Sequence, residues 1–189
     1  MSAAPSASHH SDLAAIAARI TRPVVLVGLM GVGKTTVGRK LAGLLKRDFV
    51  DADEAIVEAA QRSIPEIFAT FGEAHFRDGE RRVIARLIEE RHGVIATGGG
   101  AFVDPATRAA VLEKGIAVWI DCDVDTLVER TARRGNRPLL KQGDPREILT
   151  RLAAEREPFY RQAHIRVVSE TGPHADTARA ILEAIDTWL

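Results

Sequence analysis

The sequence predicts an α/β domain in which a parallel sheet carries helices on both faces. Five short apolar runs, each suited to a buried strand, alternate with longer segments whose apolar residues recur at helical spacing. A glycine-rich loop lies between the first apolar run and the helical segment after it, which is the order of a phosphate-binding strand, loop and helix. The 189 residues suit one domain with a substantial core and leave little room for a second.

The expected elements follow one another along the chain without an internal repeat. Strand candidates are short apolar runs, and helix candidates have apolar residues three or four positions apart. We expect strands over 24–27, 48–51, 94–97, 117–121 and 165–168, and helices over 36–45, 54–61, 73–90 and about 175–189, with another starting near residue 124. Parallel sheets gather ligands beyond the carboxyl ends of their strands, so Gly28, Asp51, Gly98 and Asp121 are expected at one rim.

The N-terminal segment differs in composition from the rest of the chain. Residues 1–11 are small and polar, with too little apolar surface to order themselves. We predict a flexible extension over 1–20, in which residues 12–20 could form a short helix, followed by one domain over 21–189. A basic start with a continuous apolar segment is missing, and no run approaches the length of a membrane span. These features predict a cytoplasmic protein.

Composition and charge exclude several classes of partner. The 26 basic and 26 acidic side chains cancel, so no global field attracts nucleic acid or an anionic membrane. Aromatic residues make up only 5% of the chain, which argues against a base-stacking surface. Cys122 is the only cysteine, so neither an intrachain disulfide nor a multi-cysteine metal site can form. We expect no nucleic-acid partner and no membrane partner.

Residues 28–35 fill every fixed position of the phosphate-binding pattern G-x-x-x-x-G-K-[ST]. Glycines let the backbone approach phosphates, and the N–H groups at the start of the following helix point at them. Lys34 adds a positive charge near the β- and γ-phosphate oxygens, and Thr35 offers a hydroxyl to Mg²⁺. The residues expected to bind a nucleotide here are Gly31, Val32, Gly33, Lys34, Thr35 and Thr36.

Two aspartates end the second expected strand. Asp51 and Asp53 are two positions apart, which directs both side chains to the same side of an extended chain. Beside a phosphate loop, one carboxylate can hold Mg²⁺ while the other accepts a hydrogen bond from a substrate hydroxyl and orients it for attack. We predict Thr35 and Asp51 as the magnesium residues. Asp121 ends another apolar run and is a rival to Asp51, and spacing alone does not choose between them.

Six motifs follow one another along the chain: the loop 28–35, Asp51-Ala52-Asp53, Phe76-Arg77, Gly98-Gly99-Gly100, Arg137-Pro138-Leu139-Leu140, and Arg156 with Pro158-Phe159-Tyr160. In this order and spacing they resemble the motifs of the shikimate kinase family. The resemblance covers residues from about 24 to 168. It implies a three-layer α/β/α P-loop kinase fold with a five-stranded parallel sheet, a substrate-binding helical region over about 53–92 and a mobile lid over about 131–145. It also implies a monomer.

The resemblance implies an activity as well. A family member transfers the γ-phosphoryl group of ATP, with Mg²⁺, to the 3-hydroxyl of shikimate, giving shikimate 3-phosphate and ADP in aromatic amino acid biosynthesis. Shikimate carries one carboxylate and three hydroxyls, so its site needs guanidinium groups for the acid and acceptors for the hydroxyls. By resemblance, Arg77 and Arg156 grip the carboxylate and Asp53 accepts from the ring hydroxyls.

Other residues receive roles from the same resemblance. Glu80, one helical turn after Arg77, could hold that guanidinium in place. The ring of shikimate is expected to lie between an apolar wall and a stretch of backbone without side chains. Phe68 and Phe76 would form the wall, and Gly98, Gly99 and Gly100 would supply the backbone. The alternative for the two phenylalanines is ordinary core packing.

The basic stretch 130–141 resembles the family's lid. Arg137 matches the lid arginine that closes over the phosphates, and Arg130 matches a position near the adenine or the α-phosphate. Pro173 falls where family members line the adenine pocket. Closure of a lid would exclude water, which otherwise competes with the acceptor hydroxyl.

The predicted mechanism is in-line phosphoryl transfer. Lys34, Arg137 and Mg²⁺ stabilise charge on the γ-phosphoryl group, and Asp53 positions or deprotonates the acceptor hydroxyl. Two other functions remain open from the sequence. One is a different small-molecule kinase, acting on gluconate or a nucleoside monophosphate, and the other is a non-catalytic nucleotide-binding protein.

Overall fold

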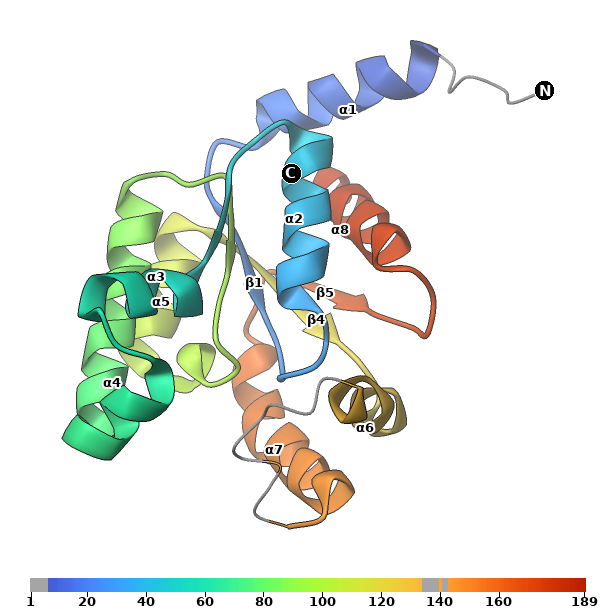
Figure 1. Cartoon of the computed structure of the whole chain (residues 1–189). Helices are drawn as coiled ribbons and strands as arrows, with labels where there is room; N and C mark the ends of the chain where they lie inside the picture. The colour runs from blue at the N-terminus through green and yellow to red at the C-terminus, as the bar shows by residue number, and fades with distance from the viewer. Residues whose placement is uncertain (1–6, 134–139, 141–142) are drawn as a thin grey trace.

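Five parallel strands in the order β2-β3-β1-β4-β5 form the centre of the protein in a computed structural model that describes residues 7–133, 140 and 143–189 (Figure 1). The strands are β1 (Val24–Val27), β2 (Phe49–Asp51), β3 (Val94–Ala96), β4 (Ile116–Asp121) and β5 (Ile165–Val168). The register pairs Val24 with both Val94 and Ile116, so β1 lies in the middle of the sheet. The loop that follows β1 therefore opens at the centre of the sheet's carboxyl edge.

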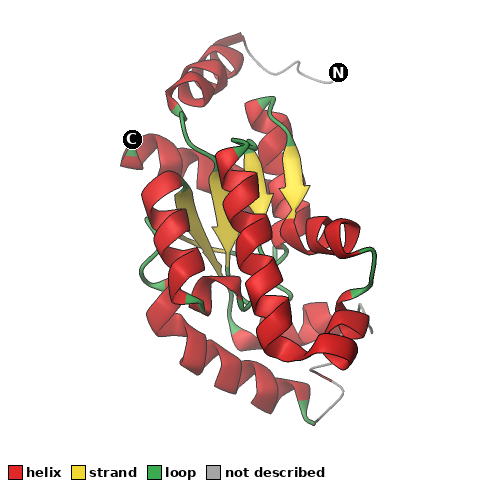
Figure 2. Cartoon of the chain, turned by 90° about the vertical axis from the view of Figure 1, so that its left-hand side faces the viewer, coloured by secondary structure: helices red, strands yellow, loops and turns green. Residues whose placement is uncertain are grey.

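Helices cover both faces of this sheet (Figure 2). They are α1 (Ala7–Arg19), α2 (Lys34–Leu45), α3 (Ala52–Ala60), α4 (Ile64–Glu89), α5 (Pro105–Lys114), α6 (Val124–Ala132), α7 (Pro145–Tyr160) and α8 (His174–Trp188), with a short 3₁₀ helix, η1 (Ala101–Val103). Helices α2 and α8 pack together, and α4 packs against α5 and α3. In the described part of the chain, no helix has both the length and the apolar character needed to cross a membrane.

The three central strands form the core because almost all of their residues are apolar. All residues of β1 and β3 are buried, as are the first five residues of β4. Only the edge strand β5 alternates between buried and exposed residues. Continuous apolar runs are typical of parallel strands that are covered on both faces. The predicted α/β fold with five parallel strands is confirmed.

Helix α4 differs most from its predicted bounds. It begins at Ile64, where Ser63 and Glu66 form a capping box, whereas the sequence predicted a start at residue 73. Gly72 inside it has φ +83 and non-helical backbone, so α4 is two helical segments joined at a kink. The predicted helix corresponds to the segment after the kink, which carries Arg77.

The N-terminal helix is longer than predicted and partly integrated into the fold. It runs from Ala7 to Arg19, and Leu13 and Ile16 pack against the core. The Arg47 guanidinium donates to the backbone oxygens of Ala17 and Ile20 at its end. Part of the predicted extension 1–20 therefore packs onto the domain.

Candidate active site

The loop after β1 has the backbone geometry of an anion-binding turn. Gly28, Gly31 and Gly33 have backbone φ values of +141, +87 and +94, which residues other than glycine rarely adopt. A Cβ atom on Gly28 would also lie 2.5 Å from the carbonyl oxygen of Ile120. Gly33 precedes the first residue of α2, so the N–H groups at the start of that helix open into the loop. This arrangement can hold phosphate oxygens.

Lys34 lies at the base of the loop. Its side chain is 9% exposed, and its Nζ donates to the backbone oxygens of Gly28 (2.7 Å) and Leu29 (2.8 Å). The loop's own carbonyls thus hold the ammonium group at the centre of the rim. A phosphate bound in the loop would meet a positive charge that is already in position.

Thr35 and Asp51 contact one another beside this lysine. The Thr35 hydroxyl donates to Oδ2 of Asp51 (2.7 Å), and Oδ1 of Asp51 accepts from the backbone N–H of Asp53 (2.9 Å), which caps α3. A hydroxyl and a carboxylate are hard oxygen ligands of the kind Mg²⁺ prefers, and Mg²⁺ normally completes its shell with water and substrate phosphates. Among the described residues, no group of three or more acidic, histidine or cysteine side chains is arranged so that it could hold a metal ion by itself. The Thr35 and Asp51 pair fits a magnesium ion shared with a nucleotide.

Asp121, the rival metal residue, has a different environment. Its Oδ2 accepts from Nε (3.1 Å) and Nη2 (2.6 Å) of Arg166, on the neighbouring strand β5. The same guanidinium lies over the ring of Trp119, 4.8 Å from its centroid. Asp121 is thus engaged by a cation, and this geometry favours Asp51 as the metal residue.

Asp53 lies across from the phosphate loop in a small cavity of about 100 Å³. The cavity is lined by residues from the ends of three neighbouring strands: Met30, Gly31, Gly33, Lys34, Thr35, Asp51, Asp53, Thr97, Gly98 and Gly99. A Cβ atom on Gly98 would lie 3.0 Å from Oδ1 of Asp53 and 3.0 Å from Oε1 of Glu80. The first of the three glycines therefore leaves room for two carboxylates next to the phosphate loop.

A second cavity, of about 500 Å³, contains both predicted acid-binding arginines. Arg77 from α4 and Arg156 from α7 line it together with Gly100. A Cβ atom on Gly99 would lie 3.2 Å from Nη1 of Arg156, and one on Gly100 would lie 2.6 Å from Nη2 of Arg77. The two guanidinium groups thus lie against consecutive glycines, although the arginines belong to helices that are distant in the sequence.

Each arginine is held differently. Nη1 of Arg77 donates to Oε2 of Glu80 at 2.7 Å, and the Glu80 side chain is only 3% exposed. Burial raises the pKa of Glu80 while the Arg77 charge opposes that rise. Nη1 of Arg156 is buried and has no hydrogen-bond acceptor among the described residues. A buried donor of this kind is costly unless a ligand supplies an acceptor, which a carboxylate would do.

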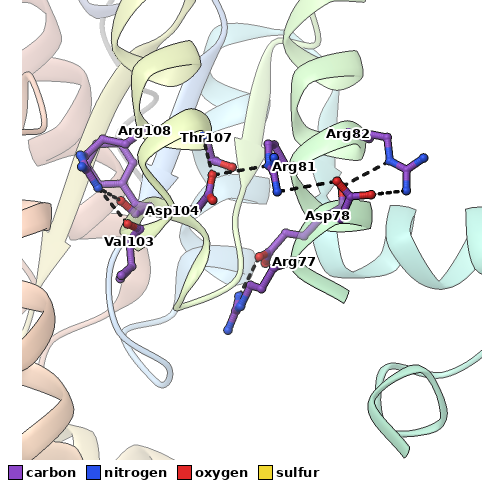
Figure 3. A network of polar contacts seen from close by, with 10 residues as sticks. Arg77, Asp78, Arg81, Arg82, Val103, Asp104, Thr107 and Arg108 are labelled. Atoms are coloured by element: carbon purple, nitrogen blue, oxygen red, sulfur yellow. Dashed lines mark hydrogen bonds and ion pairs between the residues drawn. The ribbon is translucent and has the colours of Figure 1, made fainter. Parts of the chain in front are cut away.

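A polar network joins the helix of Arg77 to the segment after the three glycines (Figure 3). Arg81 lies between Asp78 of α4 (3.7 Å) and Asp104 (3.7 Å), whose side chain caps α5 by accepting from the N–H of Thr107. On the other side, the Tyr160 hydroxyl donates to the backbone oxygen of Gly99. The glycine turn is therefore attached to both helices that supply arginines. The sequence assigned Tyr160 no contact of its own, because its partner lies 61 positions away.

The two phenylalanines belong to α4, like Arg77, whose guanidinium lies over the Phe76 ring. Phe76 is 5% exposed, and its ring lies 4.6 Å from that of Phe68, centroid to centroid. Phe76 lines a separate apolar cavity between α3 and α4, and neither phenylalanine is among the residues that line the arginine cavity. The structure brings Arg77, Arg156 and Gly100 together, and it does not bring Phe68 and Phe76 to the same cavity.

A third cavity, of about 190 Å³, lies on the other side of the phosphate loop. It is lined by Gly31, Gly33, Arg130, Arg133 and His174. Arg130 donates to the backbone oxygens of Val32 (3.2 Å) and Glu170 (2.6 Å). Pro173 precedes α8 as its N-cap residue, and its neighbour His174, which belongs to none of the sequence motifs, lines the cavity. Arg137 and most of the predicted lid over 131–145 lie outside the described residues.

Comparisons with known proteins point to one family. The family model described as shikimate kinase matches residues 30–186. The chain is 66% identical over 183 residues to a shikimate kinase of Novosphingobium aromaticivorans, covering 95% of each protein. It is 52% identical over 174 residues to a shikimate kinase of Caulobacter vibrioides, covering 92% of this chain and 86% of the relative. Among solved structures, it is similar to a shikimate kinase from Acinetobacter baumannii in complex with shikimate, with 40% identity and a TM-score of 0.84 over 91% of this chain and 97% of that one.

Proposed function

Because the chain belongs to the shikimate kinase family, whose members are ATP-dependent kinases acting on shikimate, we propose that the rim described above transfers the γ-phosphoryl group of ATP to the 3-hydroxyl of shikimate. The products are shikimate 3-phosphate and ADP, in a step of aromatic amino acid biosynthesis. One observation carries the assignment of the site. Two arginines from different helices converge on a glycine turn beside a phosphate loop, and the buried Nη1 of Arg156 has no acceptor in the part of the chain that the structure describes. We propose a cytoplasmic monomer.

The acid substrate binds between Arg77 and Arg156. Each guanidinium can donate two parallel hydrogen bonds to a carboxylate, which a lysine cannot do. Glu80 keeps the Arg77 fork in one orientation through the 2.7 Å ion pair, and bare backbone at Gly99 and Gly100 leaves space for the substrate. The ring hydroxyls then point towards Asp53 and the phosphate loop. Phe68 and Phe76, which pack against each other, are proposed to form the apolar wall beside the ring, next to Arg77, whose guanidinium lies over the Phe76 ring (5.2 Å).

Phosphoryl transfer takes place between the Asp53 carboxylate and the loop. Asp53 accepts a hydrogen bond from the acceptor hydroxyl and orients its lone pair towards the γ-phosphorus atom. As the new O–P bond forms, the bond to the β–γ bridging oxygen breaks and ADP leaves with the electron pair, while the hydroxyl proton passes to Asp53 or to water. Lys34 stabilises charge on the transferred group, and Arg137 is proposed to do so from the lid. Backbone N–H groups of Gly31–Thr36 hold the remaining phosphates.

Thr35 and Asp51 are the residues proposed to hold Mg²⁺. When bound, the ion supplies positive charge at the β- and γ-phosphate oxygens. The hydrogen bond between Thr35 and Asp51 keeps the two oxygen ligands on the same side of the loop. The carboxylate of Asp51 is also held by the N–H of Asp53, so metal ligand and acceptor-orienting residue share one turn of backbone.

The metal assignment predicts different results for two isosteric variants. Asp51→Asn is expected to raise the Mg²⁺ concentration that gives half-maximal activity by about tenfold or more, because a charged ligand is lost while the helix cap is kept. Asp121→Asn is expected to leave this concentration unchanged, because its partner is Arg166. Magnesium titration of the initial rate measures both. A shift in Asp121→Asn alone would assign the metal to Asp121.

An acceptor panel tests the proposed reaction. ADP release, measured by a coupled assay with ATP and Mg²⁺, is expected with shikimate and not with gluconate or a nucleoside monophosphate. The reason is that two guanidinium groups at one cavity match a carboxylate next to hydroxyls. If gluconate or a nucleoside monophosphate were turned over faster than shikimate, that compound would be the acceptor instead. ADP release that does not respond to any acceptor would favour a non-catalytic nucleotide-binding protein.

A further inference from the structure

Helix α7 reaches the glycine turn over residues 98–100 with two side chains. Arg156 and Tyr160 are four positions apart, so they lie next to one another on one face of the helix. A Cβ atom on Gly99 would lie 3.2 Å from Nη1 of Arg156, and the Tyr160 hydroxyl donates to the backbone oxygen of the same glycine. Tyr160 is not among the residues that line the arginine cavity, so it can act on that cavity only through the turn.

The ring of Tyr160 is supported by the sheet. Tyr160 is 2% exposed, and its ring lies 5.9 Å from the ring of Trp119 on β4, centroid to centroid. The guanidinium of Arg166, on the neighbouring strand β5, lies over the same Trp119 ring. Burial raises the pKa of Tyr160, so the hydroxyl stays protonated and keeps its proton for the Gly99 oxygen. Two strands thus fix the position of the hydroxyl that holds the glycine turn.

This hydrogen bond orients one peptide group of the turn. The carbonyl oxygens of Gly98 and Gly100 accept from backbone N–H groups in and beside η1, at 3.2 and 3.1 Å, so they are held locally. The carbonyl of Gly99, between them, is held from a distant helix by Tyr160. Because a peptide is planar and trans, the N–H of Gly100 points away from the oxygen that Tyr160 holds. The hydroxyl therefore sets the orientation of the peptide that leads into Gly100, which lines the arginine cavity.

The same hydrogen bond helps to set the distance between the turn and Arg156. Nη1 of Arg156 is buried and has no acceptor among the described residues, so it does not hold the turn itself. Its distance from Gly99 is set by the packing of α7 on η1 and by the Tyr160 hydroxyl, one helical turn away. We propose that Tyr160 is a positioning residue for the acid substrate, which keeps the glycine turn at the distance from the Arg156 guanidinium that a carboxylate requires. This inference rests on the proposed function, because it takes the acid substrate from it.

Shikimate binding in two backgrounds tests this role. Tyr160→Phe removes the hydroxyl and keeps the ring that packs on Trp119. It is expected to weaken shikimate binding about tenfold by calorimetry, the loss typical of one good hydrogen bond, and to raise the KM for shikimate equally. ADP affinity, the KM for ATP and kcat at saturating shikimate are expected to stay unchanged. In an Arg156→Ala background, Tyr160→Phe is expected to cause less than about a twofold further loss, because the guanidinium whose distance the hydroxyl sets is gone.

Controls separate this inference from a structural role and from the proposed function. Thr150→Val also removes one hydroxyl from α7, at an exposed position where it donates to the backbone oxygen of Arg146, and is expected to change neither affinity. Unchanged shikimate affinity in Tyr160→Phe would overturn the inference. Equal losses for shikimate and ADP, or the full tenfold loss in the Arg156→Ala background, would also overturn it, because the hydroxyl would then only stabilise the fold. A failure of the unchanged protein to bind shikimate would instead overturn the proposed function, and calorimetry on that protein shows it separately.

Discussion

Replacement of Asp53 by asparagine is expected to lower kcat for shikimate phosphorylation by about 10²- to 10⁴-fold, the range that a positioned acid–base group contributes. The amide keeps the volume of the side chain but removes its charge and one acceptor oxygen. Asp53 lines the same cavity as Lys34 and Thr35, and its Oδ1 lies close to Gly98. An acceptor hydroxyl that reaches a phosphate in the loop would therefore lie next to the Asp53 carboxylate. ADP affinity is expected to stay close to that of the unchanged protein, because the loop itself is intact.

Glu54→Gln is the matched control for this variant. Glu54 is the next residue on α3 and also lies in its first turn, but it is exposed and pairs with Arg39 at 3.3 Å. Both variants remove one negative charge from the start of the same helix, so any small loss of stability is expected to be shared. Near-normal kcat in Asp53→Asn would remove Asp53 from the reaction. A loss of kcat in both variants would trace the effect to the helix.

Replacement of Arg77 by alanine is expected to raise the KM for shikimate about 30-fold or more, since truncating one partner of a buried charge pair costs about 2–5 kcal/mol. The KM for ATP is expected to change little. Arg77→Lys is expected to restore only part of the affinity, because an ammonium group cannot make the paired contact of a guanidinium. Initial rates at varied shikimate and at varied ATP measure these effects.

The structure predicts a second effect of this substitution. Without Arg77, the buried Glu80 loses the charge that opposes the rise of its pKa, so the carboxyl is expected to become harder to ionise. Arg77→Ala is expected to lower the free energy of unfolding, because it leaves the Glu80 carboxylate buried without its partner. The double variant Arg77→Ala/Glu80→Gln is expected to recover that stability but not the affinity for shikimate. Arg82→Ala, which removes an exposed arginine paired with Asp78 on the same helix, is the control. An unchanged KM for shikimate in Arg77→Ala would place the acid elsewhere.

Features of the site that depend on neighbouring residues were predictable from the sequence. The loop 28–35 carries its own geometry, because glycine spacing and a following helix start define the phosphate cradle within eight positions. The pairing of Arg77 with Glu80 also follows from local order, since residues three apart lie on one helix face. Asp51 and Asp53 were expected at the rim for the same kind of reason, and they line its cavity.

Other features depend on which strands and helices become neighbours. The strand order places β3 between β2 and β1, and this brings Gly98 to Asp53 on one side and Gly99 to the phosphate loop on the other. The contact between Asp121 and Arg166 requires β4 and β5 to be adjacent, and no spacing rule predicts it. The Phe76 ring is buried beside the cavity between α3 and α4, a position that depends on how these two helices pack.

The amino-acid sequence alone determined the class of fold, the phosphate loop and the chemical types of the residues at the rim, because each of these depends on residues that are close together in the chain. Only the tertiary structure decided which of these residues meet. Arg156 reaches Gly99 and His174 reaches Gly33 through packing of helices that are distant in sequence. Such contacts depend on the order of the strands and the burial of apolar faces, which are properties of the whole domain.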